Sequence, residues 1–392
     1  MSEILLLAHR APFPPDRGDR IRSFHILKHL SARATVHLVA FADSAAEVEP
    51  APRFRAMVDE CVIVPRTKSR ARTGAEALVS GKPLSLTAFA DPRIAAAVAD
   101  ILARRPIDAI YVFSGQMAQY LPAHLPVRGP RAIMDFVDLD SAKFAAYADD
   151  ATGAKRWLMR REARLLGAFE RQVAARVDAS LFVSAPEAAL LPGGIAVENG
   201  IDTDAFDPSG AFARIEQAQP LIVFTGQMDY RPNIDAVTWF ARDILPLIPT
   251  ARFAIVGRAP TAAVRALAND RVVVTGEVPD VRGWLAAATV VVAPLKLARG
   301  IQNKVLEAMA MARPVVATHA AGEGIDHAGT IRIADDAASF ASIVQQLIAD
   351  PGNAAALGSA ARARVIARYG WDACLAPFDG LLGLETPESV AA

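Results

Sequence analysis

The sequence has little cysteine and no long apolar run. Cys61 and Cys374 are the two cysteines among 392 residues. Two thiols cannot build a disulfide framework for a chain of this length, so we expect a reducing, cytoplasmic compartment. The first apolar run, ILLL at residues 4–7, is far shorter than a membrane span or the apolar part of a signal peptide. It predicts a first buried strand and no leader.

An excess of one charge sign is also missing. The 42 Lys and Arg equal the 42 Asp and Glu, a balance that does not indicate a nucleic-acid-binding protein. The balance hides an asymmetry, because residues 1–190 carry 26 basic against 21 acidic residues, and the remainder 16 against 21. The resulting net charges of +5 and −5 are compatible with a basic N-terminal half that contacts an anionic membrane surface. They are equally compatible with two ordinary solvated surfaces.

A dinucleotide fingerprint is the third absence. No Gly-x-Gly-x-x-Gly follows the first predicted strand, which counts against a nicotinamide-dependent oxidoreductase. His25 and His29 share one predicted helix without a third ligand nearby in sequence, so no metal site is predicted there.

Short Val/Ile/Leu runs that alternate with amphipathic helices dominate what is present. Such runs occur in two blocks, beginning with EILLLAHR at residues 3–10 and PLIVFTGQM at residues 220–228. Runs of this kind are typical of parallel strands covered by helices on both faces. The predicted fold class is α/β, with two Rossmann-like doubly wound domains facing across a cleft.

The predicted division follows the polar, Gly- and Pro-containing stretch before residue 220. We expect an N-terminal Rossmann-like domain at 1–195, a linker at 196–219, a second Rossmann-like domain at 220–370, and a tail at 371–392 that returns to the first domain. A long basic helix is predicted within residues 151–179. It is interpreted either as a dock for an anionic membrane or partner, or as a solvated face.

A predicted apolar helix that starts near Gln302 carries two charges, Lys304 and Glu307. The N–H groups and dipole of its N-terminus, which follows a buried strand, would attract a phosphate. Lys304 and the preceding Arg299 would add positive charge, and the Glu307 carboxylate can accept hydrogen bonds from the vicinal hydroxyls of a ribose. An exposed i,i+3 ion pair is the alternative. The apolar residues around both charges argue against it.

The N-terminal half offers a second set of candidates. Gly18 would let a ligand approach the start of a helix. Asp19, Arg20 and Arg22 follow it, and the arginines are either phosphate ligands or surface charges. Further contacts to a ligand are predicted at the ends of later strands, at Ser114, Asp135 and Asp138.

The run NKVLEAMAMARPVVAT at residues 303–318 resembles the nucleotide-binding signature of glycosyltransferase family 4, retaining enzymes with the GT-B fold. The stretches VFTGQMDYRPNIDAVTWFARDILP, ENGIDTDAFDP and GEVPDVRGWLAAATVVVAPL agree with it. The opening RAPFPPDRGDRIRSFHILKHL resembles more closely the sugar transferases associated with exosortase (PEP-CTERM) exopolysaccharide loci.

The resemblance implies roles for particular residues. Glu307 matches the second Glu of the family's Glu-x7-Glu pair, which binds the donor ribose, whereas Arg299 stands where the first Glu is usual. Arg231 and Lys304 match a cationic pair near the diphosphate, and Ser114 and Gln116 occupy the place of a family histidine. The resemblance makes the first domain the acceptor-binding one and the second the donor-binding one. The implied catalytic residues are Arg231, Lys304 and Glu307, and the acceptor-side candidates are Asp19, Arg20, Arg22, Ser114, Asp135 and Asp138. The implied donor contacts are Gly18, Gly226, Asn233, Gly276, Glu277, Val278, Arg299, Gly300, Ile301, Gln302, Asn303, Val305 and Glu323.

The resulting hypothesis is a metal-independent hexosyltransferase-type enzyme with no cofactor. It would take a UDP- or GDP-sugar as donor and a glycan or lipid-linked acceptor, and it would act in exopolysaccharide biosynthesis. It would lie in the cytoplasm, with peripheral contact at the inner membrane surface. A nucleotide-sugar epimerase or hydrolase of the same fold, and a catalytically silent nucleotide-sugar-binding protein, remain as alternatives.

Overall fold

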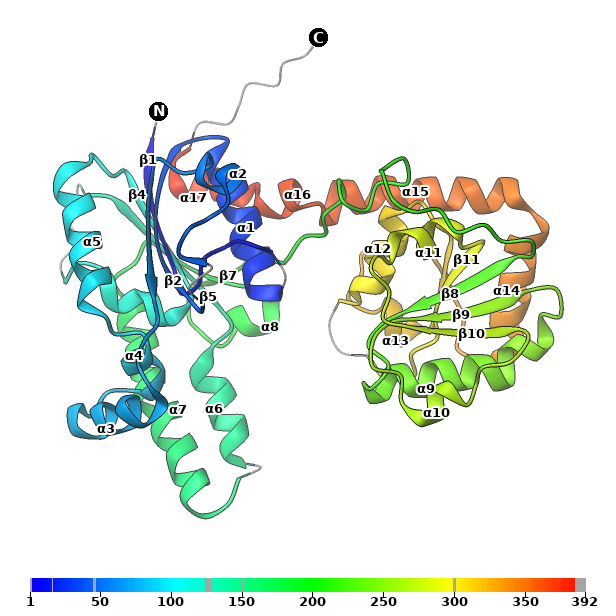
Figure 1. The fold of residues 1–392 in the computed structure, drawn as a ribbon, viewed down its shortest axis with the longest axis horizontal. Helices are drawn as coiled ribbons and strands as arrows, with labels where there is room; N and C mark the ends of the chain where they lie inside the picture. The colour runs from blue at the N-terminus through cyan, green and yellow to red at the C-terminus, as the bar shows by residue number, and fades with distance from the viewer. Residues whose placement is uncertain are drawn as a thin grey trace, which may run out of the picture. The chain divides into compact units, whose positions relative to one another are not determined.

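The structure is a computed structural model that describes residues 2–15, 17–44, 47–123, 129–149, 151–298 and 301–384. The chain divides into two compact units, residues 1–199 with 374–392, and residues 200–373. Each unit is a parallel sheet covered by helices on both faces (Figure 1). The predicted pair of Rossmann-like α/β domains is therefore confirmed.

The N-terminal unit contains a seven-stranded sheet within the described residues, in the order β3-β2-β1-β4-β5-β6-β7. Its strands are nearly continuous runs of buried apolar residues, because both faces are covered. They are β1 (Glu3–Ala8), β2 (Thr35–Ala42), β3 (Glu60–Pro65), β4 (Ala109–Phe113), β5 (Arg131–Val137), β6 (Ala179–Phe182) and β7 (Gly194–Ala196). The order reverses between β1 and β4, so the chain leaves these two neighbours in opposite directions and opens a crevice at their carboxyl ends.

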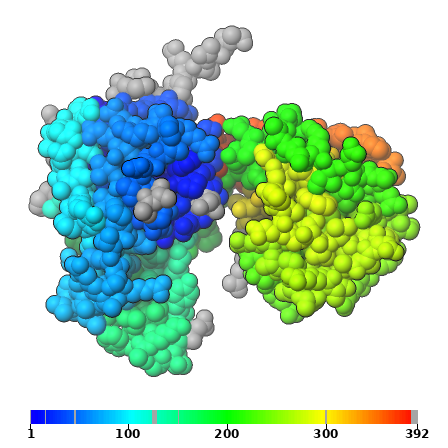
Figure 2. All heavy atoms as spheres, in the orientation of Figure 1, coloured from blue at the N-terminus to red at the C-terminus, as the bar shows by residue number. Residues whose placement is uncertain are grey.

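The helices of this unit include a pair that extends away from the sheet. In Figure 1 α6 and α7 form a hairpin, with α3 beside it, and Figure 2 shows the same end as a projection of the N-terminal unit. The helices are α1 (Gly18–Ser31), α2 (Pro52–Arg55), α3 (Arg70–Ser80), α4 (Leu84–Ala88), α5 (Pro92–Arg104), η2 (Gly115–Tyr120), α6 (Asp140–Asp149), α7 (Gly153–Ala174), α8 (Ala185–Ala188) and α17 (Pro377–Leu382).

The C-terminal unit repeats this plan. Its described strands form a six-stranded parallel sheet in the order β10-β9-β8-β11-β12-β13, which reverses between β8 and β11. The strands are β8 (Leu221–Thr225), β9 (Arg252–Val256), β10 (Val272–Gly276), β11 (Val290–Ala293), β12 (Val315–Ala317) and β13 (Arg332–Ile333). The helices are α9 (Arg231–Trp239), η3 (Phe240–Ile244), η4 (Leu245–Leu247), α10 (Ala262–Arg265), α11 (Arg282–Ala287), α12 (Asn303–Ala310), α13 (His319–Gly322), α14 (Ala337–Ala349) and α15 (Pro351–Tyr369).

The end of the chain packs in the N-terminal unit after α16 (Trp371–Leu375). Phe378 of α17 is fully buried. The Asp379 carboxylate lies 2.8 Å from Nε2 of His29 on α1, so His29 has a structural partner there. None of the helices within the described ranges has both the length and the apolar character that a bilayer span requires.

Candidate functional site

A pocket of about 500 Å³ opens at the carboxyl ends of β8 and β9 in the C-terminal unit. This is the position beside the strand-order reversal where open α/β sheets bind ligands. Its walls come from the loops after β8, β9 and β10 and from the start of α12. They comprise Thr225, Gly226, Gln227, Tyr230, Asn233, Val256, Gly257, Arg258, Glu277, Val278, Val281, Ile301, Gln302, Asn303, Lys304 and Glu307.

Two glycines allow the loops of this pocket to approach each other. A Cβ atom on Gly257 would lie 1.7 Å from the carbonyl oxygen of Gly226. A Cβ atom on Gly226 would lie 2.8 Å from Nδ2 of Asn233 and 3.2 Å from Nζ of Lys304. Any side chain at either position would therefore displace the loop or the polar groups beside it, which is why the strands end in glycine here.

Lys304 is the cation in the wall of the pocket formed by α12. Its ammonium donates a hydrogen bond to Oδ1 of Asn233 at 2.5 Å and lies 4.3 Å from the centre of the Phe224 ring. Burial lowers the pKa of Lys304 to about 8, although the neighbouring Glu307 carboxylate opposes this shift. The ammonium lacks a full counter-charge at hydrogen-bond distance within the described residues, so an anionic ligand would supply one.

Glu307 lies one turn further along α12, also on the wall of the pocket. Burial raises the pKa of its carboxyl, and the charge of Lys304 acts against this increase. Both groups are thus held partly out of water and close to each other. This is the type of environment in which pKa shifts accompany a functional site.

The N-terminus of α12 completes the polar wall. The helix begins at Asn303, with Gln302 in the capping position and without a hydrogen bond from the Gln302 side chain to the helix. The backbone N–H groups of Val305 and Leu306 donate to the carbonyl oxygen of Gln302, which leaves those of Asn303 and Lys304 available to an anion. The predicted donor contacts Arg299 and Gly300 lie outside the described residues.

Most of the predicted donor residues lie around this one pocket, although their roles remain predictions. Those on its walls are Gly226, Asn233, Glu277, Val278, Ile301, Gln302, Asn303, Lys304 and Glu307. The other described donor candidates are not on its walls. Val305 is fully buried in the core, Glu323 is exposed after α13, and Gly276 ends β10 with a φ of 69°.

Arg231, the predicted partner of Lys304 at the diphosphate, is also absent from the pocket wall. Its exposed side chain forms an ion pair with Asp235, 2.9 Å away and one turn along α9. Arg258 is the cation that lines the pocket instead, with its guanidinium 3.0 Å from Oε1 of Gln227. Sequence reasoning missed Arg258, although its position directly after strand β9 and Gly257 is a usable signal.

The N-terminal unit has a second pocket, of about 400 Å³, at the carboxyl ends of β1, β4 and β5. It carries charges of both signs, as suits a ligand with many hydroxyl groups. The residues on its walls are His9, Arg10, Asp19, Phe89, Ser114, Gln116, Phe136, Val137, Asp138, Asp140 and Lys143. Three predicted acceptor candidates, Asp19, Ser114 and Asp138, are among them. Gly18 starts α1 and is not.

His9 is the residue of this pocket that the sequence analysis passed over. It follows β1 directly, its ring stacks on Phe113, and its Nε2 lies 3.2 Å from Oδ2 of Asp19. The Asp19 carboxylate also accepts from Arg10 at 2.5 Å. His9, and with it Arg10, holds the pKa of Asp19 well below its usual range. The usable signal was the location of His9 at the end of the strand beside the order reversal.

Strained backbone marks the same pocket. Ser114 has a φ of 77° and Val137 a φ of 71°, in a region that a β-branched residue such as valine rarely enters. Residues held in such conformations are frequent at ligand sites. Ser114 directly follows β4 and Val137 ends β5, and both residues line the pocket.

The predicted acceptor contacts Arg22 and Asp135 are wrong in this structure. The guanidinium of Arg22 and the Asp135 carboxylate lie 3.0 Å apart with exposures of 1% and 0%. Tyr111 donates to the same carboxylate at 2.7 Å, and Arg22 also donates to the carbonyl oxygen of Val197. These groups form a buried structural network with no surface for a ligand. Arg20 is likewise buried, and pairs with Glu47 at 2.7 Å.

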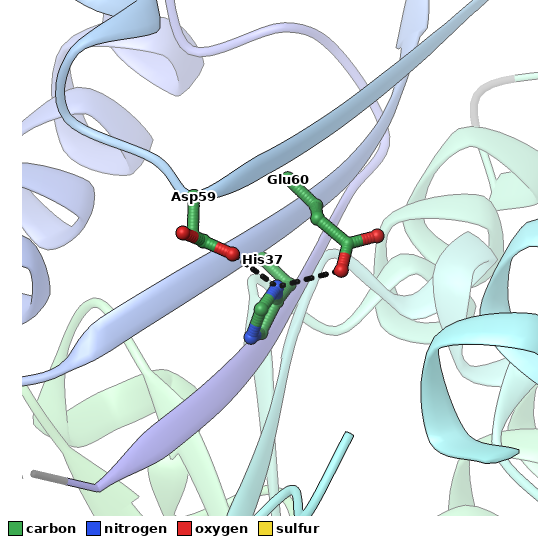
Figure 3. Close-up of side chains that lie close together, drawn as sticks. All are labelled: His37, Asp59 and Glu60. Carbon is green, nitrogen blue, oxygen red and sulfur yellow. Dashed lines mark ion pairs between the residues drawn. The ribbon is translucent and has the colours of Figure 1, made fainter. Parts of the chain in front are cut away.

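A third polar cluster lies near the amino ends of β2 and β3 in the N-terminal sheet. Figure 3 shows His37 between Asp59 and Glu60, whose carboxylate oxygens lie 3.9 and 3.8 Å from its Nδ1. Histidine and carboxylates are metal-ligand types, but here the acidic groups already have cationic partners. Arg104 and Arg105 bind Glu60 and lower its pKa to about 2. The two arginines thereby balance the negative charge of the acidic groups without a metal ion.

Comparison with known families bears directly on the first pocket. Residues 219–350, which contain every residue of its wall, match the family described as "Glycosyl transferases group 1". The matched segment covers most of the C-terminal unit, residues 200–373. A chain of two parallel-sheet α/β domains is also the fold of solved glycosyltransferases of the GT-B type.

Individual relatives are distant. Alpha-maltose-1-phosphate synthase of Mycobacterium tuberculosis is 31% identical over 205 residues, which are 45% of this chain and 52% of that protein. The chain thus spans about half the length of that relative. The lipopolysaccharide core biosynthesis mannosyltransferase LpcC of Rhizobium leguminosarum bv. viciae is 26% identical over 59% of this chain and 68% of its own.

A structural neighbour covers the whole chain. The Anabaena protein HepE, solved in complex with UDP, aligns over 98% of this chain and 100% of its own with a TM-score of 0.58 and 15% identity. At this identity the likeness concerns the fold alone. The similarity to the group 1 family therefore concerns residues 219–350, whereas the likeness of fold concerns both units.

Proposed function

We propose that the protein is a retaining glycosyltransferase of the hexosyltransferase type. It would move a sugar from a nucleoside-diphosphate sugar to a glycan or lipid-linked acceptor. The observation that carries the proposal is the pocket in the group 1 domain, where Lys304, Glu307 and the free N-terminus of α12 lie on one wall. A cation and helix N–H groups suit a diphosphate, and a carboxylate suits the paired hydroxyls of a ribose.

The proposed reaction has a simple balance of bonds. The acceptor hydroxyl oxygen forms the new bond to the anomeric carbon as the bond from that carbon to the phosphate oxygen breaks. The acceptor attacks on the face from which the diphosphate leaves, so configuration is retained, and the leaving diphosphate takes the acceptor proton. The positive charge of Lys304 and Arg258 and the α12 dipole would stabilise the charge that develops on the diphosphate. For this reason the proposal includes no metal ion and no cofactor.

The acceptor and the biological setting are proposed from likeness. The N-terminal pocket around His9 and Asp19, with charges of both signs, is the candidate acceptor site. The mannosyltransferase LpcC acts in lipopolysaccharide core biosynthesis, and the opening motif resembles transferases of exopolysaccharide loci. Both favour a lipid-linked glycan acceptor and a role in exopolysaccharide synthesis at the cytoplasmic membrane face.

The test starts with the nucleotide. Calorimetric titration with UDP, GDP and ADP, in the presence of a chelator, should reveal one preferred nucleotide. UDP is the first to try because HepE was solved with it. Labelled sugars of that nucleotide are then incubated with lipid extracts, and the products are separated. Transfer to an extract component supports the proposal. Binding without turnover identifies a silent binding protein, and donor conversion without an acceptor identifies an epimerase or hydrolase.

Nucleotide binding is expected to weaken above pH 8. The pKa of Lys304 is about 8 in the free protein, and a bound diphosphate raises it, so binding takes up a proton once Lys304 is neutral. The dissociation constant should then rise about tenfold per pH unit above that pKa. Titrations in buffers of different ionisation enthalpy would measure the proton uptake.

Lys304→Arg is the matched control for this pH dependence. A guanidinium stays charged throughout the range, so the variant should bind with little change above pH 8. An equal loss of affinity in the wild type and in Lys304→Arg would assign the pH dependence to another group.

A further inference from the structure

Bulky apolar side chains are unusually exposed on the projecting end of the N-terminal unit. Val79 and Leu78, at the end of α3, are 91% and 61% exposed, and Trp157 and Tyr147, on α7 and α6, are 60% and 55% exposed. We call these four residues the α3–α7 surface, together with the exposed basic residues Arg70, Lys82, Lys155, Arg160, Arg164 and Arg171. Apolar exposure gathered on one projection marks an interaction site more often than scattered single residues do.

Specific contacts join the elements of the α3–α7 surface. Arg161 of α7 donates to the carbonyl oxygens of Ala77 at 2.8 Å and Lys82 at 3.1 Å, so it closes the end of α3. Trp157 lies one turn before Arg161 on the same side of α7. Trp157 therefore lies on the side of α7 from which Arg161 reaches the end of α3.

The charges exposed on α7 have a single sign. Both of its acidic residues point inward, because Glu162 accepts a hydrogen bond from the backbone N–H of Leu84 at 2.7 Å and Glu170 one from that of Ser141 at 3.0 Å. These two carboxylates are 0% and 3% exposed. The exposed charged residues of α7 are consequently all basic, namely Lys155, Arg160, Arg164 and Arg171.

Further basic residues continue the same surface. Arg70 and Lys82 are exposed at the two ends of α3. Arg160, Arg164 and Arg171 also line a cavity of about 490 Å³ between α6 and α7, whose other walls are mainly alanine and glycine. Asp149 is the acidic residue of that cavity. The cavity thus offers room and excess positive charge for a small anionic group, between the two helices that carry Tyr147 and Trp157.

We propose that the α3–α7 surface docks the protein on an anionic lipid membrane. Aliphatic side chains such as Leu78 and Val79 gain free energy in the acyl boundary, whereas they offer nothing to a phosphate-sugar polymer. An indole such as that of Trp157 is favoured at the level of the lipid headgroups. The surrounding lysines and arginines attract acidic headgroups. Charge and apolar exposure on one projection together fit a lipid surface better than a nucleic acid.

This inference deepens the proposed function by assigning a surface to its membrane contact. Binding to a membrane is measured without any nucleotide sugar, so the docking proposal and the transferase proposal can fail separately.

The test is co-flotation of the full-length protein with vesicles of phosphatidylcholine, with and without phosphatidylglycerol, at low and high salt. We expect binding that requires phosphatidylglycerol and weakens with salt. The double variant Lys155→Glu/Arg160→Glu should reduce partitioning at least about tenfold, since each basic residue near the surface contributes about fivefold. The double variant Val79→Asp/Trp157→Ser should reduce it at least about tenfold as well, because it removes apolar side chains that would enter the membrane. All four positions are exposed, so the variants should fold.

Leu190→Asp is the matched control, because Leu190 is 52% exposed in the same unit but lies outside the α3–α7 surface. It should float like the wild type. Equal flotation of the patch variants and Leu190→Asp would overturn the proposal, as would the absence of wild-type binding at low salt. Light scattering provides a further test. If the wild type is a dimer and Val79→Asp is a monomer, a second copy of the chain covers this surface and the proposal is wrong.

Discussion

Replacing Lys304 by alanine is expected to lower the transfer rate about 100- to 1,000-fold, the usual cost of removing one group that stabilises the leaving charge. The ammonium lies on the pocket wall beside Glu307 and donates a hydrogen bond to Asn233, and Lys304 is the one lysine among the described residues of that wall. Glu307→Gln, which keeps the shape but not the charge, should weaken nucleotide binding by about 1–3 kcal/mol. Single-turnover rates and calorimetric titrations of the two variants separate these effects.

Lys296→Ala is the control for these measurements. Lys296 lies on the loop before α12, where its ammonium is 4.7 Å from the centre of the Trp239 ring and it does not line the pocket. Its loss should leave nucleotide affinity unchanged. Normal turnover in Lys304→Ala, with the thermal unfolding of all variants alike, would contradict the assignment of the pocket as the donor site.

Replacing Asp135 by alanine is expected to destabilise the N-terminal unit by about 3–5 kcal/mol, because it leaves the buried Arg22 without its counter-charge. Arg22 is 1% exposed and cannot reach water without opening the core. The Tyr111 hydroxyl would lose its acceptor as well. Urea unfolding of Asp135→Ala, followed by circular dichroism, measures the loss.

Two further variants make this prediction specific. Asp138→Ala removes a carboxylate that pairs with Lys143 at 2.9 Å but is partly exposed, and it should cost less than about 1 kcal/mol. Arg22→Met/Asp135→Leu removes both buried charges together and should recover much of the stability lost in Asp135→Ala. Similar losses in Asp135→Ala and Asp138→Ala would show that burial of the pair contributes little.

The elements that form the C-terminal pocket were largely predictable from the sequence. Runs such as VVVA at residues 290–293 bury both faces, and that composition alone indicates a strand of a covered parallel sheet. The carboxyl end of such a strand, followed by an apolar helix that carries Lys304 and Glu307, predicts a ligand site. These inferences depend on neighbours in sequence, so they needed no coordinates.

The interpretation of isolated charges was less successful. Arg22 and Asp135 are separated by 113 positions and meet in the core. Nothing in the local sequence distinguishes a buried arginine with a distant partner from one that faces a ligand. Arg231 and Arg258 show the same limit, because both follow strands, and only the path of each loop decides which one lines the pocket.

The sequence by itself determined the two α/β domains, their parallel sheets and the helix start that carries Lys304 and Glu307, because patterns of apolar runs and of charges within one helix are local. The tertiary structure decided which charges face the pockets and which are buried in the core. It also decided that Glu162 and Glu170 turn inward and leave the outer face of α7 basic. Burial is a property of what packs against a residue, and those neighbours come from distant parts of the chain.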